Sequence, residues 1–449
     1  MRMFKITDLS ILCLFLFIIF MTKKLNFETN CLHAGYSSKE GSLSIDVPIS
    51  LSTAFDFLSF QRGADLFNLE ESGDIYSRIS NPTNRILEER LTALEGGVGC
   101  VCFSSGMAAI TSCVLNITKT GENIVASQNL YGGTVNLFSH TFKGLGIDVR
   151  FAKNEDNIEE FEKLIDDKTK CIFIEILCNP SLSIADIEGL AKLAHKHKIP
   201  LIIDNTIPTP YLCRPFEWGA DIVVHSTTKY ISGHGNAMGG AVIDSGKFDW
   251  EGSGKFPCLT EPDPSYHGTI YTKSFKNQAY IVKLRTQFLR DFGACPSPFN
   301  SYLTIVGLET LALRMERHCS NALKLAKWLE KHPYISWVNY PGLEGNKFHE
   351  KAQKYTPKGC SSIVCFGVKG GIPECAKFIE NLKIPFYTTN LGDSRSICTH
   401  PCSTTHRQLS DEARKACGIT DDLIRFSVGL ENIDDIIADI DNALKASQK

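Results

Sequence analysis

An aspartate and a lysine stand directly behind two apolar segments of the sequence. Asp204 ends the run Leu201-Ile-Ile-Asp, and Lys229 follows the run Asp221-Ile-Val-Val, with hydroxyl groups at 226–228 just before it. If these runs are neighbouring buried strands, both side chains lie at the carboxyl edge of one sheet, where ligands bind. An amine and a carboxylate there suit pyridoxal phosphate, which forms a Schiff base with the lysine and pairs its pyridinium nitrogen with the aspartate. Taken alone, such residues are more often a solvated lysine and a capping aspartate.

A phosphate site is predicted at the same edge. Ser105-Gly106-Met107 opens a helix-like segment directly after a strand-like one, so unpaired N–H groups and the helix dipole favour an anion there. Ser226 and Thr228 can add hydroxyl donors. Tyr131 follows another strand-like run and could lay its ring on a planar cofactor, although a lone tyrosine is more often a packing residue. No strand–GxGxxG–helix unit or GK[ST] sequence occurs, which argues against a nucleotide loop.

The segments that must position these residues alternate between two patterns. Helical spacing of apolar residues occurs in the segments 81–97, 105–117, 134–146, 158–165 and 185–198. Short continuous apolar runs, typical of strands, occur at 97–105, 123–127, 147–152, 171–177, 201–204, 221–226 and 241–244. This alternation predicts an α/β fold with a large, mostly parallel sheet covered by helices on both faces.

A second, smaller α/β domain is predicted after a long helical stretch at 301–332. Strand-like and helix-like segments mix there, at 361–368, 373–382 and 432–447. The expected organisation is therefore an apolar N-terminal extension (1–20), an N-terminal arm (21–75), a cofactor-binding large domain (76–300) and a C-terminal small domain (301–449).

The composition is that of an ordinary globular protein. The 449 residues are 43% hydrophobic and 22% charged, and 47 basic against 50 acidic residues give a net charge of −3. Nothing in this balance favours nucleic acid or an acidic membrane surface as a partner. The 17 cysteines form no C-x-x-C pair, and many lie inside apolar runs, which indicates buried free thiols in a reducing compartment and no metal site.

The N-terminal run Leu9–Met21 differs from the rest of the chain. Its thirteen residues would span only about 20 Å as a helix, which is too short for a bilayer core. The length suits a signal peptide, but no small-residue cleavage site follows, and Met21 is an alternative start. A cytoplasmic protein without a membrane segment in its core is expected, with a signal or anchor left open.

The chain resembles the cystathionine/methionine-metabolism family of pyridoxal-phosphate enzymes, in particular the O-acetylhomoserine sulfhydrylases. The resemblance covers the chain from about Asn26 to Ala446 and rests on nine motifs in order: NFETNCLHAGY, IYSRISNPTN, ALEGGVG, SSGMAAI, LYGGT, LIIDNT, PYLCRPFEWGADIVVHSTTKYISGHG, THPCSTTHRQLS and IRFSVGLENIDDI. It implies the fold of type I pyridoxal-phosphate transferases.

The resemblance also implies roles for individual residues. Lys229 is similar to the Schiff-base lysine, Asp204 to the pyridinium partner and Tyr131 to the ring-stacking tyrosine. Four residues match the phosphate cradle: Gly106, Met107, Ser226 and Thr228. Tyr76 and Arg78 match residues that reach the phosphate from a neighbouring subunit. Arg425 matches the clamp for the substrate α-carboxylate, for which its planar fork is suited, and Asn179 lines the same site.

The activity that the resemblance implies is γ-replacement: O-acetyl-L-homoserine and sulfide give L-homocysteine and acetate, in a homotetramer whose active sites are shared within dimers. Tyr131-Gly132-Gly133, where methionine γ-lyases usually carry Tyr-Gly-Cys, and the segment Ser253–Thr272 favour the sulfhydrylases. A γ-lyase acting on methionine or cystathionine and a cystathionine γ-synthase remain alternatives. From another class, a membrane-tethered binding protein without catalysis would rest only on the N-terminal run.

Overall fold

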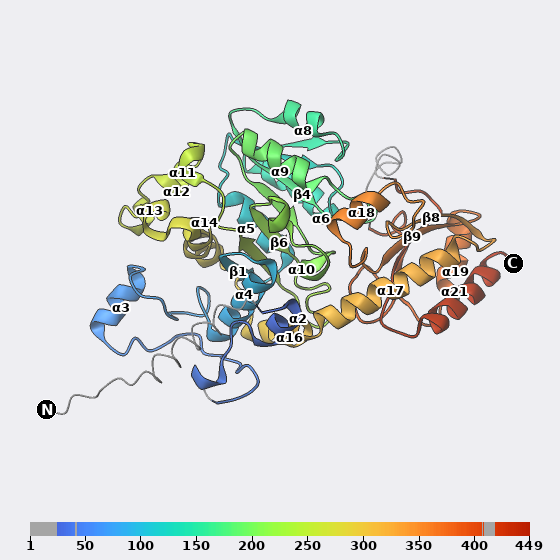
Figure 1. Ribbon diagram of the computed structural model, residues 1–449, viewed down its shortest axis with the longest axis horizontal. Helices are drawn as coiled ribbons and strands as arrows, with labels where there is room; N and C mark the ends of the chain where they lie inside the picture. Colours follow the sequence, from blue (N-terminus) through green and yellow to red (C-terminus); the bar gives the residue numbers. More distant parts are fainter. Residues whose placement is uncertain (1–24, 41–42, 406, 408–417) are drawn as a thin grey trace, which may run out of the picture.

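The computed structural model describes residues 25–40, 43–405, 407 and 418–449. The predictions about the N-terminal run at 1–20 lie outside the described residues. Two sheets, joined by a long helix, organise the chain (Figure 1). No helix within the described ranges is long and apolar enough to cross a membrane.

The larger sheet has seven strands in the order β1-β7-β6-β5-β4-β2-β3. Their bounds are β1 Gly99–Phe103, β2 Asn123–Ser127, β3 Asp148–Ala152, β4 Thr169–Glu175, β5 Leu201–Asp204, β6 Ile222–His225 and β7 Gly240–Asp244. Neighbours from β6 to β3 pair in parallel, whereas β7 is antiparallel to both β1 and β6. Six strands therefore point the same way, and the predicted mostly parallel sheet is confirmed.

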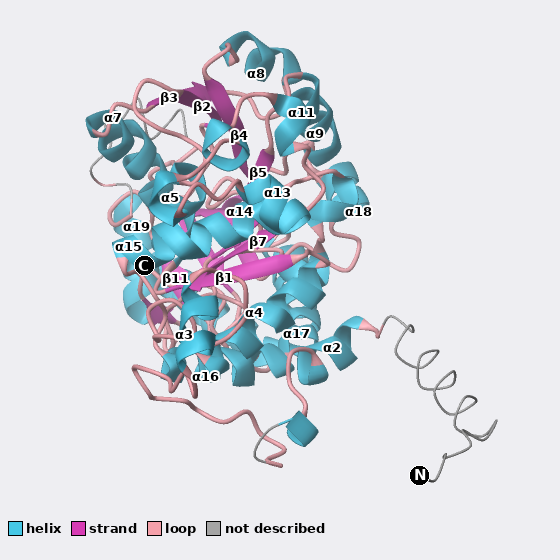
Figure 2. Cartoon of the chain, turned by 90° about the vertical axis from the view of Figure 1, so that its left-hand side faces the viewer, coloured by secondary structure: helices cyan, strands magenta, loops and turns pink. Residues whose placement is uncertain are grey.

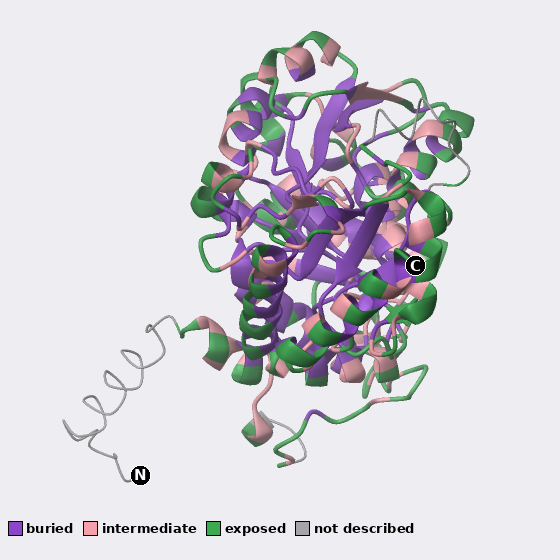
Figure 3. Ribbon diagram, turned by 90° about the vertical axis from the view of Figure 1, so that its right-hand side faces the viewer, coloured by how far each residue is buried: buried purple, intermediate pink, exposed green. Residues whose placement is uncertain are grey.

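Both faces of this sheet are buried. Successive residues of one strand, such as Ile202 and Ile203 of β5, belong to two different apolar clusters. Side chains of successive strand residues point to opposite faces, so each cluster lies between the sheet and one layer of helices. Figure 3 shows the buried strands inside a shell of helices whose outer faces are exposed. The continuous apolar runs of the sequence follow from this double coverage.

Helices lie where the helical spacing predicts them, with three differences of detail. Helix α4 shows the expected ends: Asn81 accepts a hydrogen bond from the Thr83 N–H, Pro82 occupies the first turn, and Gly96 adopts φ +80°. The segment at 134–146 is divided among α6, the π-helix η2 and α7. The stretch at 301–332 begins earlier, at Pro298, and breaks at Thr310 into α16 and α17.

The remaining elements of the larger unit and the arm are listed by their bounds. The helices are α2 Phe27–His33, α3 Phe60–Phe67, α4 Pro82–Glu95, α5 Gly106–Leu115, α6 Gly132–Asn136, α7 Phe142–Gly144, α8 Ile158–Leu164, α9 Ile187–Lys196, α10 Thr209–Leu212, α11 Trp250–Ser253, α12 Pro257–Thr260, α13 Tyr271–Phe275, α14 Ala279–Lys283 and α15 Arg290–Phe292. The 3-10 helices are η1 Ser38–Glu40, η3 Pro215–Trp218, η4 Pro264–Tyr266 and η5 Lys276–Gln278, and the π-helices are η2 Leu137–Thr141 and η6 Leu284–Leu289.

A five-stranded sheet forms the smaller C-terminal unit, in the order β10-β11-β12-β9-β8. Its strands are β8 Ile335–Asn339, β9 Ile363–Val368, β10 Phe386–Tyr387, β11 Ile397–Thr399 and β12 Leu423–Ser427. The helices from the connection onward are α16 Pro298–Glu309, α17 Leu311–Leu329, α18 His349–Tyr355, α19 Ile372–Asn381 and α21 Ile433–Ser447. Helix α17 contacts this sheet and also α10 of the larger unit, so it joins the two parts (Figure 1). The residue boundaries of the domains stay predictions.

The segment before α4 lies largely outside the main body. Helix α2 packs against α4 and α16, whereas α3 extends away from the sheets in Figure 1. In Figure 2, which views the chain from that side, α3 lies in front of the rest of the chain. Several large apolar side chains of this segment are exposed: Leu43, Ile45, Leu51, Leu58, Phe60 and Phe67, of which Ile45 is 96% and Phe60 is 95% exposed. Apolar exposure on this scale is typical of a surface that packs against another protein.

Candidate active site

Six strands of the larger sheet end at one edge, and five of them lead into predicted site residues. Strand β1 leads into Ser105 and Gly106, β2 into Tyr131, β4 into Asn179, and β6 into Lys229, while β5 ends at Asp204 itself. Arg425 comes from β12 of the smaller sheet, and its Nη1 lies 3.3 Å from Asn179 Oδ1. The candidate site is therefore placed where the two sheets meet.

The N-terminus of α5 and the turn after β6 are in direct contact. Ser105 caps α5 by accepting a hydrogen bond from the Ala108 N–H (3.1 Å). A Cβ added to Gly106 would lie 2.6 Å from the Ser226 Cβ, so only glycine allows this approach. Thr228 Oγ1 bonds both backbone groups of Gly239 and stiffens the turn. Gly106, Met107 and Ser226 thus surround the positive end of a helix, an arrangement suited to a phosphate.

Lys229 has an environment that favours its neutral form. Its Nζ donates a hydrogen bond to Asn390 Oδ1 at 2.7 Å. Burial, with a smaller contribution from the Arg425 charge, lowers the pKa of Lys229 to about 8. Arg314 of α17 holds the following residues in place, because its guanidinium donates to the carbonyls of Tyr230 and Ile231. A lysine held in this way can act as a nucleophile and as a base near neutral pH.

Two buried carboxylates lie side by side at the ends of β4 and β5. Glu175 and Asp204 are paired in the sheet register, and burial raises the pKa of both, the Asp204 charge adding to the shift of Glu175. Asp204 Oδ1 accepts a hydrogen bond from the Thr206 N–H (2.9 Å), and no cation among the described residues forms an ion pair with it. Since a nearby positive charge favours the ionised form, a ligand N–H cation would reverse the shift of Asp204.

Tyr131 is half exposed, and its backbone is held by one of these two carboxylates. The Tyr131 N–H donates to Glu175 Oε1 at 2.5 Å, and the residue precedes α6. A Cβ on Gly133 would lie 2.5 Å from Tyr131 Cε1, so the ring lies against this glycine. With 52% of its surface exposed, Tyr131 is available to a ligand.

Arg425 is a buried guanidinium without a carboxylate partner among the described residues. Only 4% of it is exposed, and burial lowers its pKa. Besides Asn179, its Nη2 donates to the Asn390 carbonyl (2.8 Å) and to Thr399 Oγ1 (3.0 Å), whereas Nε has no hydrogen-bond partner. A buried charge is normally paired, so this arrangement fits an anionic ligand such as a carboxylate.

Tyr76 and Arg78 are not joined to the other candidate residues by any described contact. Both are exposed, and the Arg78 guanidinium lies 5.4 Å from the Tyr76 ring centroid. Arg78 Nη1 donates to the Arg290 carbonyl at 2.9 Å. Within one chain these two side chains therefore belong to the surface near α15.

Comparison with known proteins identifies the family. Residues 28–445 match the model of the Cys/Met metabolism PLP-dependent enzymes. The chain belongs to this family. It is 46% identical to "Homocysteine/cysteine synthase" of Saccharomyces cerevisiae, over 94% of this chain and 98% of the relative. It is 47% identical to "O-acetyl-L-homoserine sulfhydrylase" of Leptospira meyeri, over 95% and 98%.

A solved structure supports the same assignment. The crystal structure of a putative O-acetylhomoserine (thiol)-lyase from Campylobacter jejuni superposes with a TM-score of 0.91 at 42% identity, covering 94% of this chain and all of the other. That structure contains N'-pyridoxyl-lysine-5'-monophosphate. This protein is thus a pyridoxal-phosphate enzyme with the type I transferase fold, as the resemblance implied.

The described residues fit pyridoxal 5′-phosphate as the cofactor of this family member. The close approach of Gly106 to Ser226 leaves backbone N–H groups of α5 for the phosphate, and Asp204 is a buried carboxylate without a cation. Lys229 supplies an amine of lowered pKa. No group of His, Cys, Asp and Glu among the described residues could hold a metal ion.

Sequence reasoning missed three features of this site. Asn390 contacts both Lys229 and Arg425, and Glu175 anchors Tyr131. Behind Asp204, the Nε2 atom of the fully buried His225 lies 2.6 Å from Glu95 Oε1. The available signal was weak: Glu175 lies inside an apolar run.

Proposed function

We propose that this family member replaces the γ-acetoxy group of O-acetyl-L-homoserine with sulfide, giving L-homocysteine and acetate. The observation that carries the proposal is the link made by Asn390. Its side chain accepts a hydrogen bond from Lys229 Nζ, and its carbonyl accepts one from Arg425. Asn390 thus holds the proposed base, Lys229, close to the proposed carboxylate-binding residue, Arg425. The curated relatives with nearly full coverage carry names of this activity.

In this proposal each residue has a definite task. Arg425 and Asn179 bind the substrate α-carboxylate, which fixes the amino acid beside Lys229. Bound pyridoxal phosphate supplies the electron sink for the Cα–H bond. Lys229 would accept the Cα proton as a general base, and a second proton would leave the β-carbon. Acetate then departs from the γ-carbon, sulfide adds there, and protons return to the β- and α-carbons, which gives a net replacement.

The remaining predicted residues hold the cofactor. Asp204 would keep the pyridinium nitrogen protonated, and Tyr131 would stack its ring on the cofactor ring. Gly106, Met107 and Ser226, around the start of α5 and the turn after β6, would donate hydrogen bonds to the phosphate. Thr228 would donate its hydroxyl there in place of its present bond to the Gly239 carbonyl.

The activity is tested with the full chain loaded with pyridoxal phosphate. Homocysteine and 2-oxobutyrate are quantified together from O-acetyl-L-homoserine, with and without sulfide. Sulfide-dependent homocysteine with little 2-oxobutyrate is expected. Dominant 2-oxobutyrate, formed from methionine or cystathionine as well, would identify a γ-lyase, and cystathionine formed from added cysteine would identify a cystathionine γ-synthase.

Gly133 provides a matched pair of variants for the placement of Tyr131. In Gly133→Ala the new Cβ would lie 2.5 Å from Tyr131 Cε1, so the ring must move away from its present position. We expect homocysteine formation to fall roughly tenfold, because misplaced groups lose catalytic alignment. Steady-state kinetics measure the effect. Gly132→Ala is the control, since its Cβ would meet nothing within 4 Å. Equal rates in both variants and the parent would contradict this role of Tyr131.

We further propose that subunits share active sites in a dimer, two of which form a tetramer. Tyr76 and Arg78 then reach the phosphate bound by the partner subunit. Their exposure, and the exposed apolar side chains of the preceding segment from Leu43 to Phe67, support this proposal.

The shared site predicts that Arg78→Ala loses cofactor. A hydrogen bond from a charged donor to phosphate contributes about 1.5–3 kcal/mol, so retention of pyridoxal phosphate should weaken roughly 10- to 100-fold. Cofactor remaining after gel filtration, read by absorbance, measures this. Arg62→Ala is the control, because Arg62 lies in the same segment and pairs with Glu71. Cofactor retention unchanged by Arg78→Ala would count against shared sites.

A further inference from the structure

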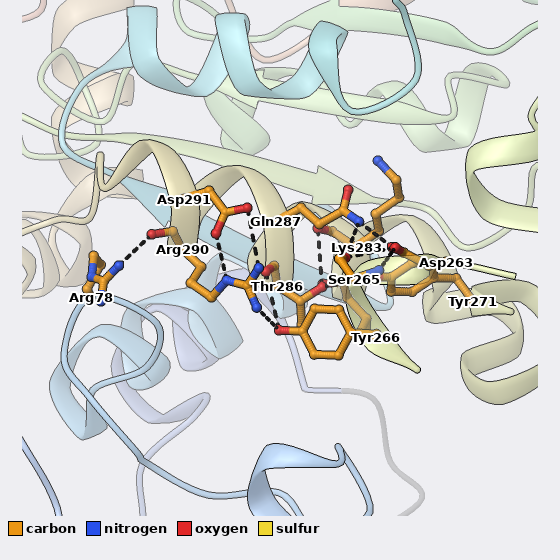
Figure 4. A network of polar contacts seen from close by, with 11 residues as sticks. Arg78, Asp263, Ser265, Tyr266, Tyr271, Lys283, Thr286, Gln287, Arg290 and Asp291 are labelled. Atoms are coloured by element: carbon orange, nitrogen blue, oxygen red, sulfur yellow. Dashed lines mark hydrogen bonds and ion pairs between the residues drawn. The ribbon is translucent and has the colours of Figure 1, made fainter. Parts of the chain in front are cut away.

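The loop from Asp263 to Tyr271 is fastened to one helix by several side chains (Figure 4). Tyr266 OH accepts a hydrogen bond from Arg290 Nη1 (2.6 Å) and lies 3.3 Å from the Thr286 carbonyl. The Arg290 guanidinium also lies 5.0 Å from the Tyr266 ring centroid. Asp263 accepts hydrogen bonds from Gln287 and from the backbone and hydroxyl of Ser265. The loop thus contacts η6 and α15 between Thr286 and Arg290.

The same helix holds the segment that carries Arg78. Arg78 Nη1 donates to the Arg290 carbonyl (2.9 Å), and Arg285 Nη1 donates to the Ile79 carbonyl (3.0 Å). Just beyond the helix, the Ala294 carbonyl accepts a hydrogen bond from the Ser104 N–H (2.8 Å), directly before the capping serine of α5. One helix end therefore contacts both the arginine at the surface and the strand end that leads into the phosphate cradle.

The end of this helix explains why Arg290 can accept from Arg78. Helix α15 stops at Gly293, which has φ +73°, so the last carbonyls of the helix lack intrahelical donors. These carbonyls form the negative end of the helix dipole, which attracts a guanidinium. The preceding η6 is a π-helix, an irregularity that often marks functional segments. The position of the accepting carbonyl depends on how the last turn is held, and Tyr266 holds the side chain of that residue.

We infer that Tyr266 is a positioning residue for the cofactor phosphate: through Arg290 it fixes the carbonyl that orients Arg78 toward the partner subunit's site. This inference rests on the proposed sharing of sites. Lys229 and Arg425 lie on other elements, so the contribution of Tyr266 is to cofactor retention, and it is made to the site in the other subunit.

The first test is Tyr266→Phe, which removes the hydroxyl and keeps the ring against Arg290. The dissociation constant of pyridoxal phosphate, from absorbance titration of the apoenzyme, should rise roughly fivefold. This is less than for Arg78→Ala, because Arg78 remains and only its positioning through Arg290 is weakened. Arg290→Lys should act in the same direction, since it keeps the charge and loses the planar fork. Tyr355→Phe is the matched control: it removes a tyrosine hydroxyl that is bonded to Asp186 and has no described contact with Arg78 or Arg290.

Mixed dimers decide through which subunit Tyr266 acts. In a dimer of one Lys229→Ala and one Arg78→Ala subunit, the only complete site combines Lys229 of the second with Arg78 of the first. The occupancy of this site is measured at increasing concentrations of pyridoxal phosphate. At each concentration borohydride reduction fixes the pyridoxyl group on Lys229, and the amount of label is quantified. Tyr266→Phe added to the subunit that supplies Arg78 should weaken binding roughly fivefold. The same change in the subunit that supplies Lys229 should leave it unaltered.

The outcomes separate the inference from the proposal beneath it. An equal effect in both placements, or none in either, overturns the role of Tyr266 while the sharing of sites stands. If the mixed dimer without Tyr266→Phe labels no better than Arg78→Ala alone, the sharing of sites fails and the inference fails with it.

Discussion

Lys229→Ala should abolish turnover, with a loss of roughly 10³-fold or more, because one amine serves as the covalent attachment and as the general base. Borohydride reduction of the loaded parent enzyme should fix a pyridoxyl group on the peptide that contains Lys229, and the variant should lack this label. The lowered pKa of Lys229, about 8, means that a substantial fraction of the amine is neutral in the cofactor-free enzyme near that pH.

Two further variants make this result specific. Lys229→Arg keeps a positive charge opposite Asn390 but cannot release its proton, so it should be as inactive as the alanine variant. Lys273→Ala removes an exposed lysine and should keep full activity and label. An active Lys229→Ala enzyme, or a label fixed on another lysine of the parent, would refute the assignment.

Arg425→Ala should lower kcat/KM for O-acetyl-L-homoserine roughly 30- to 5,000-fold. Removing one partner of a buried, hydrogen-bonded charge pair costs about 2–5 kcal/mol, and the substrate carboxylate would lose both donors of the fork. Steady-state kinetics with sulfide in excess measure the loss. Pyridoxal phosphate should remain bound, because the proposed cofactor contacts lie on the larger sheet.

Arg425→Lys distinguishes geometry from charge. It keeps the charge but cannot maintain bonds to Asn179, Asn390 and Thr399 together with a two-point bond to substrate, so it should recover little of the loss. Arg395→Lys is the control. Arg395 is exposed, pairs with Asp393, and lies in the segment between β10 and β11 that also contains Asn390. Full activity of Arg425→Lys would show that charge alone suffices.

Most of the larger fold could be predicted because its signals are local. The cap, proline and glycine around α4 act within a few residues, and double burial makes strands such as β4 and β5 continuous apolar runs. The break at Thr310 is different. There the Thr310 N–H bonds the Gly307 carbonyl, and Arg314, 5% exposed, also reaches Gly307 while holding Tyr230 and Ile231. A tertiary contact of this kind does not change the spacing of apolar residues, so the break could not be predicted from the sequence.

The direction of β7 was likewise decided by the tertiary structure. Its run at 241–244 looks like the neighbouring parallel strands, because burial on both faces gives the same composition in either direction. Only its pairing between β1 and β6 distinguishes it. The consequence matters for the site, since β7 is the one strand of the sheet whose carboxyl end lies at the opposite edge.

The meeting of Asp204 and Lys229 at one sheet edge could be predicted from local pattern, because each follows an apolar run and the carboxyl ends of parallel strands must meet. The tertiary structure alone decided what surrounds them. Asn390 reaches Lys229 across 161 residues of sequence, and Arg425 enters from a second sheet. Such contacts depend on how separate units pack, and packing joins residues whose separation along the chain carries no pattern.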